Sequence, residues 1–298
     1  MKIERWGKAY LFAIAAVLCW STIPTAFKWA LAEAEITEIL TVASLASTLV
    51  LLLIVAATGK MKLLLKTGRR DLANSALLGL INPFIYYLIL LRAYDLLPGQ
   101  VAQPLNMIWP IVLVFLSVPL LGQKVPAASY ISLFISFAGV YIISSQGRPL
   151  NPSETNITGV LLATGSSFFW ALYFILNILD KRDQAVKLLV NFLFASLYLI
   201  LFSLITGRSL VPDLPSAVAA SLYIGVFEMG LTFYLWLKAM QLSSSNDKIG
   251  NLVYLSPFIS LLLLNIFIGE PIYLTTPVGL LFIIGGILYQ NRKIVARL

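Results

Sequence analysis

One acidic residue, Glu228, stands in the middle of the apolar stretch formed by residues 225–240. A charged side chain in hydrocarbon costs about 3 to more than 10 kcal/mol, so such residues usually face a protein-lined cavity and mark the path of an ion or a substrate. Residues four apart share a helix face, which predicts a stripe of Glu228, Thr232 and Trp236. The alternative is a permanently protonated Glu228 that donates one interhelical hydrogen bond and is structural only.

The chemistry open to this carboxylate is the exchange of a proton for a cationic group. We expect Glu228 to be protonated when its site is empty, because burial disfavours the charged form. A bound ammonium group favours the carboxylate and expels the proton. The two would then compete for one site.

Composition decides the solvent in which this chain folds. With 59% hydrophobic residues, 11% charged residues and a mean hydropathy of +0.90, it is too apolar for a soluble domain, where about 25% of residues are charged. Cys19 is the lone cysteine and histidine is absent, so no disulfide and no soft metal site is expected. No phosphate-binding P-loop occurs, and we expect neither a cofactor nor direct use of ATP. The sequence indicates an integral membrane protein.

Apolar segments of about 20 residues, the length that crosses a hydrocarbon core of about 30 Å, follow one another along the chain. Ten are predicted, at residues 8–31, 37–57, 72–95, 99–121, 127–145, 158–180, 186–206, 216–241, 248–269 and 273–290. A polar interval, residues 145–158, separates five segments from five. We therefore expect an all-α polytopic membrane protein built from two five-helix repeats, residues 1–146 and 147–298, that form one unit.

The positions of Lys and Arg predict the orientation, because cytoplasmic loops near membrane segments carry an excess of positive charge. Most of the 21 basic residues fall on the side of the N-terminus, and four fall on the other, namely Lys28, Arg92, Arg148 and Arg208. Both termini are therefore expected in the cytoplasm. The same bias explains the net charge of +8 without nucleic acid as a partner.

Short sequence matches recur between the two halves at a nearly constant spacing of 146 to 150 positions. The matched pairs are Trp20 with Trp170, Leu91 with Leu237, Pro110 with Pro257, and Gly139 with Gly286. An odd number of helices per repeat inverts the second half relative to the first, the architecture of carriers whose central site opens to either side.

The same register supplies a test of Glu228. At a spacing of 146, its counterpart is Asn82, and the counterpart of Thr232 is Tyr86. Polar residues at equivalent depths are expected if both halves line one cavity. Alternatively, Asn82 serves a backbone carbonyl that Pro83 leaves without a partner.

Three tryptophans, Trp20, Trp109 and Trp170, fall near the middle of predicted helices, whereas membrane tryptophans normally lie at the interfaces. A deep indole can simply pack against lipid or core. Three at one depth predict an aromatic chamber suited to flat or cationic ligands. The other residues predicted to line this central substrate site are Tyr86, Tyr173, Tyr254, Asn106, Asn251 and Lys28.

These residues carry a family resemblance. Trp20-Ser-Thr, the paired ends Pro110…Gly122-Gln-Lys and Pro257…Gly269-Glu-Pro, and the glycines of helices 5 and 10 resemble EamA-type members of the drug/metabolite transporter superfamily. Trp109-Pro110 is also similar to the subgroup of aromatic amino acid and paraquat exporters. The chain departs from the family pattern at Gln123, where Glu is usual, and from the subgroup at Glu228.

The resemblance implies a monomeric, alternating-access carrier in a bacterial inner membrane that exports amino acids or related amphipathic metabolites, with membrane lipid and a small-molecule substrate as partners. The alternative is a proton-coupled importer or a multidrug or quaternary-cation exporter on the same fold. Proton competition at Glu228 would suffice for antiport; in an uncoupled carrier Glu228 would only anchor the substrate amine. An enzyme or a lipid flippase is not expected, because no nucleophile–base pair and no catalytic or metal-ligating set is present.

Overall fold

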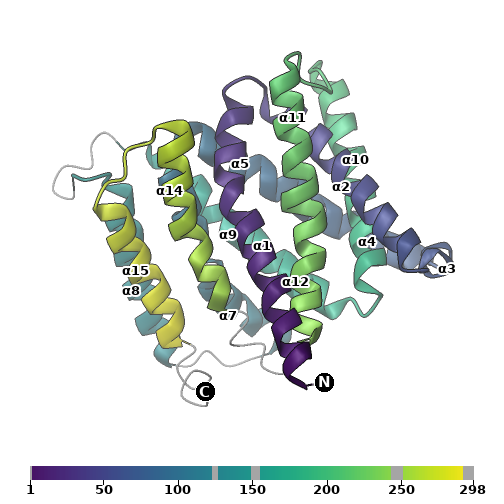
Figure 1. Cartoon of the computed structure of the whole chain (residues 1–298), viewed down its shortest axis with the longest axis horizontal. Coiled ribbons are helices and arrows are strands. Elements are labelled where there is room, and N and C mark those ends of the chain that lie inside the picture. Colours follow the sequence, from purple (N-terminus) through teal and green to yellow (C-terminus); the bar gives the residue numbers. More distant parts are fainter. Residues whose placement is uncertain (1, 123–126, 149–154, 243–250, 291–298) are drawn as a thin grey trace.

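The computed structural model describes residues 2–122, 127–148, 155–242 and 251–290, and its regular structure in these ranges is entirely helical (Figure 1). The first half contains α1 (Lys2–Leu31), α2 (Ile36–Ala57), α3 (Met61–Leu65), α4 (Arg69–Gly79), η1 (Leu80–Ile85), α5 (Tyr86–Leu96), α6 (Gly99–Asn106), α7 (Trp109–Leu121) and α8 (Ala127–Ser144). The second contains α9 (Ile157–Leu179), α10 (Gln184–Thr206), α11 (Pro215–Ile224), η3 (Gly225–Gly230), α12 (Leu231–Leu242), η4 (Asn251–Leu255), α14 (Ser256–Ile268) and α15 (Thr275–Gln290).

Seven helical segments in the described part of the chain are long and apolar enough to cross a membrane, at 7–31, 36–57, 69–96, 99–121, 157–179, 184–206 and 215–236. Three further apolar helices are shorter, at 129–144, 252–268 and 275–289. They lie where the remaining predicted spans were placed. The all-helical, multi-pass membrane architecture predicted from the sequence is therefore confirmed.

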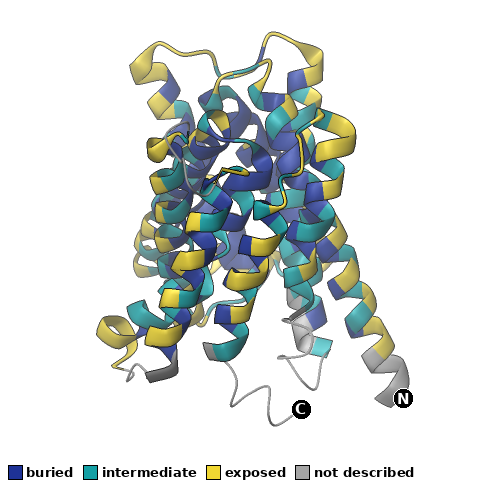
Figure 2. Ribbon diagram, turned by 90° about the vertical axis from the view of Figure 1, so that its left-hand side faces the viewer, coloured by how far each residue is buried: buried dark blue, intermediate teal, exposed yellow. Residues whose placement is uncertain are grey.

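The outer faces of the bundle are apolar, as lipid contact requires. Large side chains such as Phe134, Leu11 and Ile205 are 76%, 67% and 83% exposed, whereas buried residues run along the interior (Figure 2). Small polar residues such as Ser44 and Ser196, whose hydroxyls lie 2.8 Å apart, join α2 to α10 inside the bundle. Hydrogen bonds of this kind hold membrane helices together where the hydrophobic effect cannot.

Helix packing repeats between the halves. In the first half α1 packs against α12 and α14, and in the second α9 packs against α5 and α7. The last helices of the two halves, α8 and α15, pack against each other at one side of the bundle (Figure 1). The helices α2 and α10 also pack together. The packing of α1 thus has a counterpart in the packing of α9.

Two π-helical turns interrupt the third and eighth spans at matching places. The turn η1 contains Pro83 and breaks the helix at Asn82, whose backbone is extended (φ −149°, ψ 124°). The turn η3 contains Glu228 and has no proline. A π turn leaves backbone groups without their usual partners and is frequent at functional sites. Here the Thr232 hydroxyl donates to the carbonyl of Phe227, five residues earlier, and satisfies one such group.

Close backbone contact fixes both π turns in place. A Cβ atom added at Gly225 would lie 2.3 Å from the carbonyl oxygen of Ala43 in α2, and one added at Gly79 would lie 2.3 Å from that of Asn191 in α10. Only glycine permits this approach. The Ser47 hydroxyl adds a 2.8 Å hydrogen bond to the Gly225 carbonyl. The position of Glu228 is therefore set by α2.

The spans that contain Pro110 and Pro257 restart near these prolines. The helix α6 ends at Asn106 and α7 begins at Trp109, while the 3₁₀ turn η4 precedes α14. Proline tolerates the first helical turn because its missing N–H needs no partner there. The helix α14 ends at Gly269, whose φ of +76° reverses the chain and aims Glu270 back at the bundle.

The helix α1 begins at the end of the bundle where α15 terminates (Figure 1). We call this the N-terminal end. A polar network there ties the turn after α9 to α4. Arg182 binds Asp180 at 2.5 Å and the Ser75 hydroxyl at 2.7 Å. Lys187, which is 1% exposed, donates to the carbonyls of Asn177 and Asp180 at 2.6 and 2.8 Å. Lys187 therefore caps the end of α9, and Arg182 joins the turn after it to α4.

Candidate functional site

Glu228 lies inside the bundle on the turn η3. Its Oε1 accepts a 2.8 Å hydrogen bond from the Tyr87 hydroxyl of α5. Its Oε2 is shielded from solvent and has no hydrogen-bond partner within the described ranges. A buried carboxyl oxygen without a partner is costly, so a native structure retains one where a ligand or a proton completes it. This oxygen is the feature around which the candidate site is built.

The predicted stripe along this helix is altered by the π turn. The Thr232 hydroxyl donates to the backbone carbonyl of Phe227. The indole of Trp236 instead packs on Trp20 of α1, with ring centres 5.2 Å apart. The π turn η3 contains one more residue per turn than an α-helix, so the side chains that follow it point in other directions. A prediction based on 3.6 residues per turn does not include this change.

A second polar chain lies beside the first, across α5, α6 and α9. The Tyr86 hydroxyl donates to Asn106 Oδ1 at 3.3 Å, and Asn106 Nδ2 donates to the Ser166 hydroxyl at 2.7 Å. The rings of Tyr86 and Tyr87 are in edge contact, 4.7 Å between centres. Two of the predicted site residues, Tyr86 and Asn106, are therefore brought together next to the partner of Glu228.

The three predicted tryptophans belong to one aromatic cluster, defined here as Trp20, Tyr86, Trp109, Trp170, Phe233 and Trp236. Phe233 joins Trp20 to Trp170, at ring-centre distances of 6.4 and 5.8 Å. Trp170 also contacts Tyr86 at 5.1 Å and Trp109 at 6.5 Å. Offset and edge contacts of this kind leave ring faces available to a flat or cationic ligand.

Two further predicted site residues, Asn82 on η1 and Tyr173 on α9, are also buried inside the bundle. Asn82 is 1% exposed and its Oδ1 has no hydrogen-bond partner among the described residues. The turn η1 that carries Asn82 packs on α9 and α10. Tyr173 contacts Trp170, 6.3 Å between ring centres, and so reaches the aromatic cluster.

The remaining predicted residues are placed differently. The Lys28 ammonium donates to the carbonyls of Tyr94 and Leu97 at 2.9 and 3.3 Å, so it caps the end of α5 and is not part of the Glu228 cluster. Tyr254 on η4 is partly buried against the core. The side chain of Asn251 falls outside the described residues.

Opposite the N-terminal end, the two halves are joined by a carboxylate. Glu270 accepts hydrogen bonds from the backbone N–H groups of Gly99, at 2.7 Å, and Gln100, at 3.0 Å, at the start of α6. The Gln100 side chain returns a hydrogen bond to the carbonyl of Pro271. An acidic group at a helix N-terminus satisfies orphan donors and complements the helix dipole. Glu270 thus ties the segment after α14 to the start of α6 at this end of the bundle.

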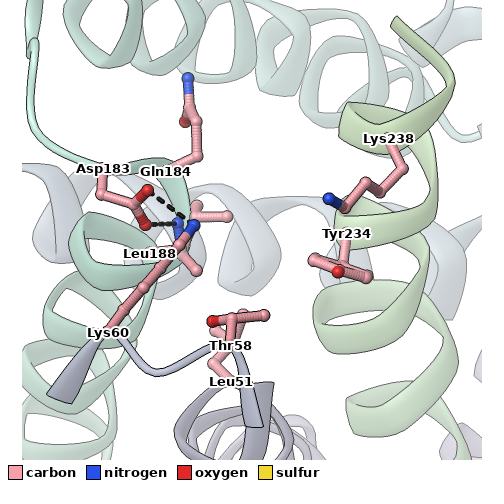
Figure 3. Close-up of a pocket in the computed structure, with 9 residues that line it drawn as sticks. Leu51, Thr58, Lys60, Asp183, Gln184, Leu188, Tyr234 and Lys238 are labelled. Carbon is pink, nitrogen blue, oxygen red and sulfur yellow. Dashed lines mark hydrogen bonds and ion pairs between the residues drawn. The ribbon is translucent and has the colours of Figure 1, made fainter. Parts of the chain in front are cut away.

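Of the cavities formed by the described residues, two that open to the surroundings do not include Glu228 in their lining. One, of about 170 Å³, lies at the N-terminal end between α2, α10 and α12 (Figure 3). The other, of about 690 Å³, is an apolar groove between α1, α11 and α14 with Trp29 and Phe267 at its edge. The aromatic chamber therefore remains a prediction.

Sequence reasoning missed three members of the site. They are Tyr87, which is the hydrogen-bond partner of Glu228, Ser166, which accepts from Asn106, and Phe233, which contacts Trp170. The signal for Ser166 was weak, because serine is common in packed membrane helices. Phe233 stands next to Thr232 and was hidden by the assumption of a regular helix.

Comparison with known proteins gives a consistent result. The pattern of the EamA-like transporter family matches residues 7–145 and 157–291. The uncharacterized transporter YvbV of Bacillus subtilis is 29% identical over 82% of this chain and 78% of its own. The aromatic amino acid exporter YddG of Ancylobacter novellus is 24% identical over 62% of this chain and 64% of its own. One crystal structure superposes with a TM-score of 0.68 at 20% identity, over 98% of both chains.

Proposed function

We propose, since this chain belongs to the EamA-like transporter family, that it is a secondary-active transporter that exports amino acids or related small amphipathic metabolites by alternating access. The observation that carries the substrate class is the free Oε2 of Glu228, enclosed in an apolar bundle beside the aromatic cluster. An ammonium group supplies the missing partner of that oxygen. An aromatic or apolar body supplies contact area to the indoles.

In this proposal a proton binds at Glu228 in alternation with the substrate. A protonated Glu228 is neutral, and a bound ammonium group neutralises the ionised form. In either state the protein can change conformation without exposing a bare charge to its low-dielectric interior. The same change with a bare carboxylate would have a large cost. The Tyr87 hydroxyl at 2.8 Å supports this role, because it donates to the charged form and holds the carboxyl group in one place. Exchange of substrate for protons follows.

Alternating access requires two halves that rock about the site. The matching π turns, the matching glycine contacts of Gly79 and Gly225, and the repeated packing of α1 and α9 support two inverted five-helix repeats, residues 1–146 and 147–298, and ten spans in total. Glu270 ties α6 to the segment after α14 at one end in this conformation. Its release would open that end to the site.

The basic residues support an orientation with the N-terminal end of the bundle in the cytoplasm of a bacterial cell, and the protein in its inner membrane. In a Cys19→Ser background, a cysteine at Lys66 should react with an impermeant thiol reagent only after permeabilisation. One at Ser209, in the exposed turn after α10, should react on intact cells. The reverse pattern would overturn the orientation and the direction of export.

The function is tested by reconstituting the purified protein in liposomes and following radiolabelled amino acids with and without a pH gradient. We expect saturable transport that the gradient accelerates, with aromatic amino acids among the best substrates. Trp170→Ala should raise the half-saturating concentration by about three- to tenfold, because one ring–ring contact contributes about 0.5–1.5 kcal/mol.

Phe168→Ala is the matched control, since this ring lies on the same helix but is 43% exposed. It should leave saturation unchanged. Equal effects of the two substitutions would show that Trp170 acts through packing alone, and absence of any transport of amino acids would refute the substrate class.

A further inference from the structure

The cavity at the N-terminal end carries charged groups on opposite walls. One wall is formed by Lys60 and Asp183, whose Nζ and Oδ2 atoms lie 2.7 Å apart. The other is formed by Tyr234 and Lys238 of α12, which face the ion pair across the opening (Figure 3). A volume of about 170 Å³ holds several water molecules or the polar head of a small zwitterion, but not a large side chain as well.

The acidic wall is already neutralised. Besides its ion pair with Lys60, the Asp183 carboxylate accepts hydrogen bonds from the backbone N–H groups of Ala185, at 3.1 Å, and Val186, at 3.4 Å. It thereby caps the first turn of α10. The Asp183 carboxylate is therefore held by groups of the protein itself, and it has few hydrogen-bonding positions left for a ligand.

The basic wall is not neutralised in the same way. The Lys238 ammonium lies 5.6 Å from the centre of the Tyr234 ring, and no carboxylate of the described ranges is in ion-pair contact with it. Stacking on a phenol ring holds the charge in place without cancelling it. Among the described residues, Lys238 therefore places a positive charge without a carboxylate partner at the edge of the cavity.

We propose that this cavity is an anion-recognition site in which Lys238 binds the carboxylate of the substrate before the substrate reaches Glu228. The inference rests on the proposed function, because it takes the transported molecule to be an amino acid. The Thr58 hydroxyl is a neutral polar group at hand for the same ligand.

The two charges divide the recognition of a zwitterion between them. Lys238 follows Glu228 by ten residues on one span, which is about 15 Å along a helix axis. An amino acid head cannot reach both at once. Lys238 selects for a carboxylate at the entrance, and Glu228 then takes the ammonium group in the interior. Molecules with an ammonium group but no carboxylate would not be bound by Lys238.

The test measures occupancy of the cavity directly and does not require transport. A reporter cysteine replaces Gln184 in the Cys19→Ser protein, held in nanodiscs of phosphatidylcholine, and its reaction with a maleimide is followed. Phenylalanine should slow the reaction, and phenylalaninamide, which lacks the carboxylate, should not. Lys238→Gln should raise the protecting concentration of phenylalanine by about three- to tenfold, in the range of an ionic hydrogen bond in a partly exposed site.

Lys62→Gln is the matched control, because this lysine is exposed and does not line the cavity. It should behave as the unsubstituted protein. Equal protection by phenylalanine and its amide, no protection by either, or protection that survives Lys238→Gln would overturn the proposal.

A second arm repeats the assay in phosphatidylglycerol nanodiscs. If the anionic lipid alone protects the cysteine and phenylalanine adds nothing, the ligand is a lipid phosphate and the entrance proposal is wrong. Carboxylate-dependent protection in a protein that moves no amino acid in liposomes would leave the site standing and refute the proposed function instead.

Discussion

Replacing Glu228 by Gln is expected to abolish transport driven by a pH gradient. The amide keeps the size of the side chain and can still accept a hydrogen bond from Tyr87, so packing of η3 against α2 should be preserved. It cannot take up or release a proton. In liposomes, the gradient-dependent rate should fall to the rate without a gradient, while binding of an ammonium-containing substrate should weaken by tenfold or more, about 1.5–3 kcal/mol for a hydrogen bond to a charged group.

Glu35→Gln is the control for loss of a carboxylate. Glu35 is the exposed residue that precedes α2 and pairs with Arg208 at 3.1 Å. This variant should transport as the unsubstituted protein does. If Glu228→Gln also keeps its response to the pH gradient, Glu228 does not carry the proton.

Removal of the Glu270 carboxylate is expected to open the end of the bundle where it binds the start of α6. Glu270→Ala leaves the N–H groups of Gly99 and Gln100 without their acceptor. Each hydrogen bond to a charged group contributes about 1.5–3 kcal/mol, so exposure of this end should rise by tenfold or more. The measurement is the rate at which an impermeant thiol reagent reaches a cysteine at Thr276, a buried position whose hydroxyl lies 3.4 Å from Gln100 Oε1.

Two further variants grade this effect. Glu270→Gln keeps an oxygen acceptor but loses the charge, and its labelling rate should be intermediate. Asp95→Ala removes an exposed carboxylate from the same end that pairs only with Arg92 of its own helix, and it should change nothing. A labelling rate that is the same in Glu270→Ala and in the unsubstituted protein would show that other contacts hold this end closed.

The apolar spans and the depth of Glu228 could be predicted because each depends on local sequence. Segment length and hydropathy determine where a chain crosses the membrane, and they placed the spans close to those of the structure. The family was also recognised correctly, from the matched Pro110 and Pro257 ends. The internal spacing of 146 even placed Asn82 and Glu228 on matching π turns, although the turns themselves were not foreseen.

The partners of the site residues could not be predicted in the same way. The hydrogen bond from Tyr87 to Glu228 joins residues 141 positions apart, and sequence pattern carries no information on such a pair. The register of Thr232 depends on one extra residue in η3, whose cause is the contact of Gly225 with α2. Lys28 was predicted to line the substrate site, and the hydrogen bond of its long side chain to the carbonyl at the end of α5 was not foreseen.

The most direct test of the account is proton flux measured together with substrate flux in the same liposomes, for the unsubstituted protein and for Glu228→Gln. The account predicts that the unsubstituted protein moves protons against the substrate, and that Glu228→Gln retains at most uncoupled substrate movement without protons. Substrate transport by the unsubstituted protein without accompanying protons, and at the same rate in Glu228→Gln, would contradict it and leave Glu228 a structural residue.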